Sequence, residues 1–162
     1  MRKRSSLLLV MLALVAAPIT TAHYTADASS QGGAAPTLVG AWSIDVTPTL
    51  APAFVSLGTF SADGTLTNIS MPSLVFPPES PGYGAWVKTG KGQYAITFHT
   101  VVGDGAGNLG ARGKVRGTLT VGPTGDDLTG VFQVDVFDPV GALIISDTGT
   151  VQGSRLKVEA LP

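Results

Sequence analysis

The segment Gly82 to Phe98, GYGAWVKTGKGQYAITF, is the part of the chain that most resembles a phosphate-binding loop. Such a loop holds phosphate oxygens with glycine N–H groups, and it needs the pattern G-x-x-x-x-G-K-[ST] at the start of a helix. Here five residues separate Gly84 from Gly90, Gly92 stands where the serine or threonine should be, and the following residues alternate as in a strand. The sequence therefore predicts a hairpin tip at this point and no nucleotide site.

A second segment, GDGAGNLG, has side-chain oxygens at Asp104 and Asn108, spaced as in a calcium loop. A calcium loop also needs an oxygen ligand between these positions, where this chain has Ala106, and a distal glutamate, which is missing. We therefore interpret the segment as a connection between two strands. The sequon Asn68-Ile69-Ser70 is a possible glycosylation site, although so short a pattern often occurs by chance.

Residues that hold metals or act as nucleophiles are scarce. The chain has no cysteine and two histidines, His23 and His99, whereas a zinc site needs three or four ligands. A serine hydrolase would carry a G-x-S-x-G turn, which is absent. His99 alternates away from the apolar face of its own strand, so we interpret it as a solvent-facing histidine. No metal and no cofactor are predicted.

Short apolar runs with a period of two, separated by turn residues, make up the chain after residue 37. Turn sequences such as Asp63-Gly64 separate them, and no window has the 3.6-residue period of a helix. The expected fold is therefore all-β, an antiparallel up-and-down meander of about eight or nine strands closed into a small barrel, because closure removes exposed edges. A two-sheet sandwich is the alternative. The expected strands are Leu38–Thr47, Phe54–Ser61, Thr65–Met71, Gly84–Thr89, Gln93–Val102, Arg112–Val121, Leu128–Phe137, Leu143–Val151 and Ser154–Glu159.

The first 22 residues have the three parts of a secretory signal peptide. A basic start is followed by an apolar run from Leu7 to Ala17, and then by small residues that permit cleavage near Ala22. The apolar run is shorter than the 20 or so residues of a membrane-spanning helix. We expect a signal peptide at 1–22, a flexible leader at 23–36 and a single barrel domain at 37–162. A secreted or periplasmic protein with no integral membrane segment after signal removal is predicted.

Charge argues against nucleic acid as a partner. Three of the ten basic residues lie in the first four positions, so the mature chain keeps seven basic and all eleven acidic residues. The remaining lysines and arginines form no dense cluster, and a mildly acidic surface without a basic stripe does not bind polyanions well.

Gly40-Ala41-Trp42, on the first expected strand, resembles the G-x-W signature that opens lipocalins and related calycin barrels. The resemblance implies that Trp42 plugs one end of the barrel, and that an arginine of the last strand, here Arg155, lies across it. It also implies a lumen that binds a small molecule. A weaker similarity is to allene oxide cyclase-like barrels, whose lumen guides the cyclisation of an apolar substrate.

These observations favour a carrier that binds a small apolar or amphipathic molecule in its lumen. One alternative is a cofactor-free cyclase or isomerase in which Tyr83, Trp86, His99 and Arg116 position the substrate or transfer protons. Another is a structural envelope protein with a filled core. The proline-rich segment Met71 to Trp86 forms either a lid over the mouth or a cover on the outer wall. The expected ligand-binding residues, in the lumen or at its mouth, are Phe76, Tyr83, Trp86, Tyr94, Phe98, Arg116 and Phe132.

Overall fold

The computed structural model of the protein describes residues 36–70 and 78–161. All of these belong to one compact unit, Gly33–Pro162. The signal peptide expected at 1–22, most of the leader expected at 23–36, and Phe76 lie outside the described residues.

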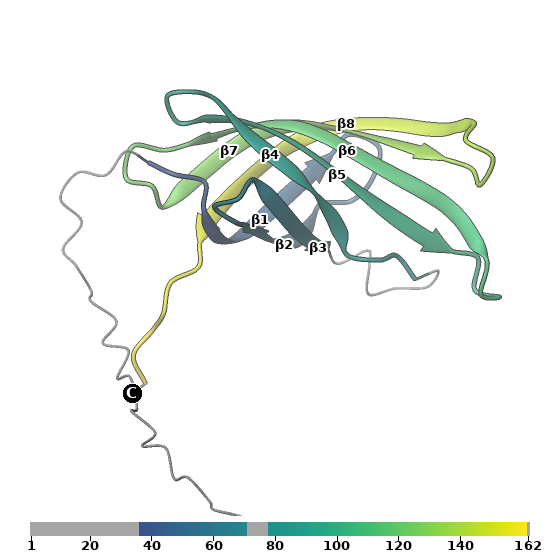
Figure 1. The fold of residues 1–162 in the computed structure, drawn as a ribbon, viewed down its shortest axis with the longest axis horizontal. Coiled ribbons are helices and arrows are strands. Elements are labelled where there is room, and N and C mark those ends of the chain that lie inside the picture. Colours follow the sequence, from purple (N-terminus) through teal and green to yellow (C-terminus); the bar gives the residue numbers. More distant parts are fainter. Residues whose placement is uncertain (1–35, 71–77, 162) are drawn as a thin grey trace, which may run out of the picture. The chain divides into compact units, whose positions relative to one another are not determined.

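Eight antiparallel strands follow one another around a closed barrel, each hydrogen-bonded to the next (Figure 1). The up-and-down order predicted from the sequence is confirmed, and the two-sheet sandwich is wrong. The strands are β1 (Gly40–Pro48), β2 (Phe54–Phe60), β3 (Thr65–Ser70), β4 (Gly82–Gly90), β5 (Gln93–Gly103), β6 (Leu109–Val121), β7 (Asp127–Phe137) and β8 (Leu143–Arg155).

The barrel closes where β1 pairs with β8, in a register that runs from Trp42 opposite Arg155 to Pro48 opposite Gly149. Closure leaves neither of these strands with an unpaired edge. The β4–β5 hairpin has a tight turn with Lys91-Gly92 at its tip, and Gly92 has a φ of 69°. The segment that resembled a phosphate loop is thus a hairpin.

Two strands expected at the end of the chain are one strand in the structure. The sequence suggested a break near Gly153, but β8 continues to Arg155, and Gly153 pairs with Ile44 on one side and Leu128 on the other. A Cβ at Gly153 would lie 3.0 Å from the Ser43 carbonyl oxygen and 3.1 Å from Leu128 Cγ. This glycine therefore serves close strand packing and does not make a turn.

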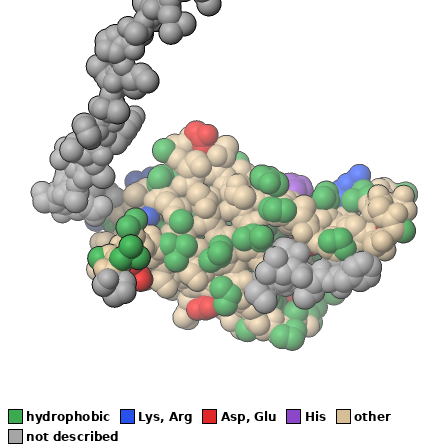
Figure 2. Space-filling model, turned by 90° about the horizontal axis from the view of Figure 1, so that it is seen from below, with side chains coloured by type: hydrophobic (Ala, Val, Ile, Leu, Met, Phe, Trp, Pro, Cys, Tyr) green, Lys and Arg blue, Asp and Glu red, His purple; other side chains and the backbone are tan. Residues whose placement is uncertain are grey.

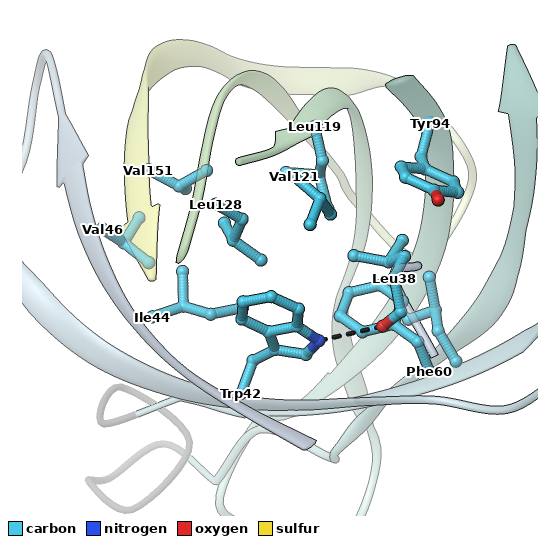
Figure 3. Close-up of a cluster of buried hydrophobic side chains, with 11 residues drawn as sticks. Leu38, Trp42, Ile44, Val46, Phe60, Tyr94, Leu119, Val121, Leu128 and Val151 are labelled. Atoms are coloured by element: carbon cyan, nitrogen blue, oxygen red, sulfur yellow. Dashed lines mark hydrogen bonds between the residues drawn. The ribbon is translucent and has the colours of Figure 1, made fainter. Parts of the chain in front are cut away.

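Alternation along the strands directs one set of side chains into the barrel, as the period-two pattern predicted. The apolar core gathers at one end, which we call the closed end, and Figure 3 shows its side chains together with the indole of Trp42. Its buried members are Leu38, Trp42, Ile44, Val46, Phe60, Leu66, Tyr94, Leu119, Val121, Leu128 and Val151.

Residues 36–39 come before the first strand, although the sequence placed Leu38 inside it. Strand β1 begins at Gly40, whose φ of 131° is a conformation that side chains rarely adopt. A Cβ at this position would also lie 2.5 Å from Arg155 Nη1. The preceding segment packs into the core, and Leu38 is fully buried there.

At the opposite end, which we call the mouth, the β5–β6 and β7–β8 hairpins extend furthest (Figure 1). Pro78, Glu79 and Ser80 attach to β5 at this end. The Gly103 N–H donates to the Pro78 carbonyl at 2.9 Å, the Ser80 N–H donates to the Val101 carbonyl at 2.8 Å, and Glu79 forms a bridge with Val102. The described residues contain no helix that is long and apolar enough to cross a membrane.

The outer wall carries several exposed apolar side chains. Figure 2 shows one face, on which they are spread among polar ones. Some are cross-strand neighbours, such as Leu57 and Ile69 on β2 and β3. Such residues suit a pleated surface and support strand pairing. The exposed apolar residues of β2 to β5 are Val55, Leu57, Ile69, Tyr83, Val87 and Val101.

Candidate functional site

A tryptophan and an arginine seal the closed end. The Arg155 guanidinium lies over the indole of Trp42, with Cζ 4.3 Å from the ring centroid. Its three nitrogens also donate to carbonyl oxygens, Nε to Gly125 at 2.7 Å, Nη1 to Val39 at 2.6 Å and Nη2 to Thr37 at 2.5 Å. The indole Nε1–H donates to the Leu38 carbonyl at 2.9 Å, drawn as a dashed line in Figure 3. One arginine thus ties together β8, the β6–β7 turn and the segment before β1.

Two further aromatic residues complete this seal. Tyr94 is buried, and its hydroxyl donates to the Pro36 carbonyl at 3.0 Å. Trp86 meets its ring edge-on, with centroids 5.5 Å apart, and donates its indole N–H to the Ser61 carbonyl at 3.1 Å. Because the polar atoms of both residues bond to backbone at the closed end, we assign these two aromatics to the seal.

Between the seal and the mouth lies a cavity of about 260 Å³. Its walls come from inward-facing side chains of the strands and are mostly apolar. An apolar cavity of about 150 Å³ in a well-packed protein stays dry and accepts benzene, so this lumen has room for a somewhat larger molecule. The apolar side chains that line it include Ile44, Val46, Phe54, Phe60, Leu66, Ile96, Phe98, Val102, Val115, Leu119, Phe132, Val134, Val136 and Val151.

Two neutral polar side chains on neighbouring strands, Ser56 on β2 and Asn68 on β3, also line the lumen. The Asn68 Nδ2 donates to Ser56 Oγ at 2.6 Å, and the Ser56 hydroxyl donates to the Ile69 carbonyl at 3.1 Å. Asn68 is the asparagine of the sequon, and its side chain faces the lumen, away from the outer surface. A hydroxyl or amide of a ligand can find a hydrogen-bonding partner at this pair, and Ser70 and Thr100 are further neutral polar residues of the lining.

The charged side chains that line the lumen are Glu79, just before β4, and Asp147, on β8. A Cβ at Gly113 would lie 3.9 Å from Glu79 Oε1, so the carboxylate lies alongside a stretch of β6 that has no side chain. Asp147 accepts the Leu50 N–H at 3.1 Å and the Thr148 N–H at 2.7 Å. Both carboxylates come from the mouth half of the barrel.

The predicted ligand-binding residues are distributed over different parts of the molecule. Phe98 and Phe132 line the lumen, whereas Tyr94 and Trp86 belong to the closed end. Phe76 lies outside the described residues.

Tyr83 and Arg116 were also expected in the lumen or at its mouth. Tyr83 alternates outward from β4 and is 63% exposed. Arg116 alternates outward from β6 and pairs with Asp135. The segment Met71 to Trp86 was expected to form either a lid or a cover on the outer wall. Its residues 71–77 lie outside the described residues, while Tyr83 and Trp86 belong to the ladder of β4 and β5.

A polar cluster on the outer wall involves Asp135, which is buried although it faces outward. Its carboxylate accepts from the Ser146 hydroxyl at 2.7 Å and from Gln133 Nε2 at 2.8 Å, and it also pairs with Arg116. The hydrogen bonds from Ser146 and Gln133, with the charge of Arg116, lower the pKa of Asp135 below its usual value despite desolvation. The cluster links β6, β7 and β8 through the side chains of Arg116, Asp135 and Ser146.

The segment that resembled a calcium loop is stabilised from within. The Asp104 carboxylate accepts from the Asn108 side chain at 2.9 Å and from the N–H groups of Ala106 and Asn108 at 2.8 and 2.9 Å. The side-chain bond from Asn108 is the main cause that lowers the pKa of Asp104. Among residues 36–70 and 78–161, no three His, Cys, Asp or Glu side chains gather closely enough to hold a metal ion.

The polar lining residues Ser56, Asn68, Glu79 and Asp147 were not predicted from the sequence. The sequence contained a signal for two of them. Asn68 is two residues from Leu66, and Ser56 is an even number of residues from Phe54 and Phe60, so each points to the same face of its strand as these apolar residues. A polar residue at an inward position of a barrel strand marks a candidate contact. Glu79 gave no such signal, because no regular strand was expected there.

No protein-family model matches this chain, and no curated protein matches it either. The geometry and chemistry of the lumen therefore carry the functional interpretation.

Proposed function

We propose that this protein is a lipocalin-like carrier that binds one small apolar or amphipathic molecule non-covalently in its lumen. The observation that carries the proposal is the apolar cavity of about 260 Å³ between the sealed end and the mouth. Burial of ligand carbon in such a cavity supplies affinity at roughly 25 cal/mol per Å² of apolar surface removed from water. The Ser56–Asn68 pair orients a polar group of the ligand.

A lumen-filling variant tests this proposal. The neutral dye N-phenyl-1-naphthylamine, which fluoresces strongly in apolar surroundings, should bind the wild-type protein saturably with one site. Val134→Trp places a large ring in the lumen, so dye binding should weaken at least tenfold. Val87→Trp, on the exposed outer wall, is the matched control and should leave binding unchanged. Absence of saturable binding to the wild-type protein would overturn the carrier proposal and favour the structural envelope protein.

The cyclase or isomerase alternative lacks a shared site in the structure. Tyr83, His99 and Arg116 alternate to the outer wall, and Trp86 packs at the closed end. Side chains that transfer protons must reach the same substrate at hydrogen-bonding distance. These four residues do not meet in the lumen, so the carrier function has the better support.

Export is part of the proposal, because the first 22 residues have the composition of a signal peptide. Amino-terminal sequencing of the protein from the medium or periplasm of its host should give a start at His23 or within the next few residues. A mature protein that retains Met1 to Ala17 would show that this segment is an anchor.

A further inference from the structure

Among the residues that the structure describes, the charged side chains that line the lumen all have the same sign. Glu79 and Asp147 are its charged lining residues, and both are acidic. None of the seven basic residues in the described part lines the cavity. Arg155 bonds to backbone carbonyls at the closed end and Lys157 pairs with Asp126. Arg112, near the mouth, lies on the outer face of β6 and donates to the Pro139 carbonyl at 3.1 Å.

The two carboxylates approach the lumen from different walls. Glu79 lies between β3 and β4 with its carboxylate alongside Gly113 of β6, while Asp147 lies on β8, two strands further around the barrel. Asp147 is held in place by the Leu50 and Thr148 N–H groups, which donate to its two oxygens. A head group at the mouth that approaches the wall of β6 to β8 therefore lies near negative charge.

Charge inside such a cavity acts strongly, because the apolar walls screen it less than water does. Desolvating an anionic head group close to two carboxylates is unfavourable, whereas a cationic head group gains from both. A ligand with a neutral hydroxyl or amide head can still bond to Ser56 and Asn68.

We infer that the lumen selects apolar molecules with a cationic amine or a neutral polar head, and rejects carboxylate ligands such as fatty acids. This inference rests on the proposed carrier function, and it names the ligand class of the same site. Glu79 and Asp147 are the residues that determine specificity.

Three ligands with the same eight-carbon chain distinguish the carrier function from the charge selection. Octylamine is protonated at pH 7, octanoate is ionised and 1-octanol is neutral. Their affinities are measured by displacement of N-phenyl-1-naphthylamine and by isothermal titration calorimetry. We expect octylamine to bind at least tenfold more tightly than octanoate, with 1-octanol between them.

The variant Glu79→Gln/Asp147→Asn should reduce the ratio of octylamine to octanoate affinity to less than about threefold, while 1-octanol binding changes little. Glu79→Gln alone should reduce the ratio part of the way. Because this single variant keeps the two hydrogen bonds of Asp147, it tests the inference even if the double variant does not fold. The control Asp45→Asn/Glu159→Gln removes the same net charge from exposed positions and should keep the wild-type ratio.

Each outcome bears on a different claim. If octanoate binds as tightly as octylamine while 1-octanol binds, the charge selection is wrong and the carrier function stands. If amine preference survives in the double variant, Glu79 and Asp147 are not its source, and the inference is overturned. If neither 1-octanol nor the dye binds, the carrier proposal fails and the inference fails with it.

Discussion

Trp42 is a central residue of the closed end. It is fully buried, and its N–H donates to the Leu38 carbonyl. Trp42→Ala should lower the free energy of unfolding by about 3–5 kcal/mol, the range for loss of a buried large aromatic side chain. Trp42→Phe keeps a ring but loses the hydrogen bond, so it should cost less. Denaturant titration followed by circular dichroism measures both. A cost below about 1 kcal/mol for Trp42→Ala would contradict this role.

Arg155 shares only part of its interactions with Trp42. The stacking contact between the guanidinium and the indole is worth about 0.5–2 kcal/mol. A double-mutant cycle of Trp42→Ala and Arg155→Ala should give a coupling energy of about this size. The bonds to the carbonyls of Thr37, Val39 and Gly125 do not involve the indole. Arg155→Ala should therefore remain destabilising in the Trp42→Ala background, but by less than in the wild type. Full additivity of the two changes would show that the stacking contact contributes nothing.

Asp135 should make the free energy of unfolding depend on pH in the acidic range. Its folded-state pKa lies below that of the unfolded chain, because Ser146, Gln133 and Arg116 favour the carboxylate. The stabilisation is therefore complete above the unfolded pKa of about 3.9 and is lost as pH falls through the folded value. Asp135→Asn should destabilise the protein at pH 7 but make less difference near pH 3, as measured by urea titration. The exposed Asp45→Asn is the control; an equal effect of Asp135→Asn at both pH values would contradict this linkage.

Alternation along a strand indicates which way a single side chain points, and this direction could be read from the sequence. Phe98 and Phe132 belong to alternating apolar runs, and both line the lumen. Tyr94 also points inward, but its depth in the barrel depends on strand register, which the sequence does not reveal. Arg116 faces outward because it alternates with Val115 and Gly117, and this direction too could be read from the sequence.

Strands β4 and β5 approach each other closely at Gly84. A Cβ at this position would lie 2.0 Å from the Thr97 carbonyl oxygen and 2.5 Å from Phe98 Cα, both of them backbone atoms that cannot rotate away. Gly84→Ala should therefore destabilise the barrel by about 1–3 kcal/mol or more, as overpacking does. Thermal unfolding followed by circular dichroism measures the effect.

Gly103→Ala is the matched control on β5. The nearest atoms to a Cβ there lie 3.5 to 3.9 Å away, which is ordinary contact, so the change should stay within about 0.5 kcal/mol. Equal effects of the two substitutions would show that β4 can move away from β5, and that the close approach at Gly84 is not required.

At the level of elements, the sequence predicted the strands well and their ends less well. Period-two alternation and turn residues identified every strand, since these are local signals. The break expected at Gly153 and the strand start expected at Leu38 were wrong, because glycine marks both turns and close packing. Only the pairing of β8 with its two neighbours distinguishes these uses, and pairing is a long-range property.

At the scale of the whole molecule, residues 36–39 before β1 should contribute substantially to the free energy of unfolding. Pro36, Thr37, Leu38 and Val39 each offer a carbonyl to a buried or half-buried donor, from Tyr94, Arg155 or Trp42. Full burial of the Leu38 side chain contributes about 1.5–3 kcal/mol, and each hydrogen bond about 0.5–1.5 kcal/mol. A protein that begins at Gly40 should thus lose at least about 3 kcal/mol of unfolding free energy.

A matched truncation isolates the effect of this segment. A protein that begins at Gly33 keeps residues 36–39 and should be as stable as one that begins at His23, because both contain the hydrogen bonds and the buried Leu38 described above. Urea titration of the three proteins, followed by circular dichroism, measures the differences. Leu38→Ala in the protein that begins at His23 should reproduce a large part of the loss, about 2–5 kcal/mol for a buried leucine. If the protein that begins at Gly40 is as stable as the one that begins at Gly33, the strands alone close this end, and the segment is not part of the seal.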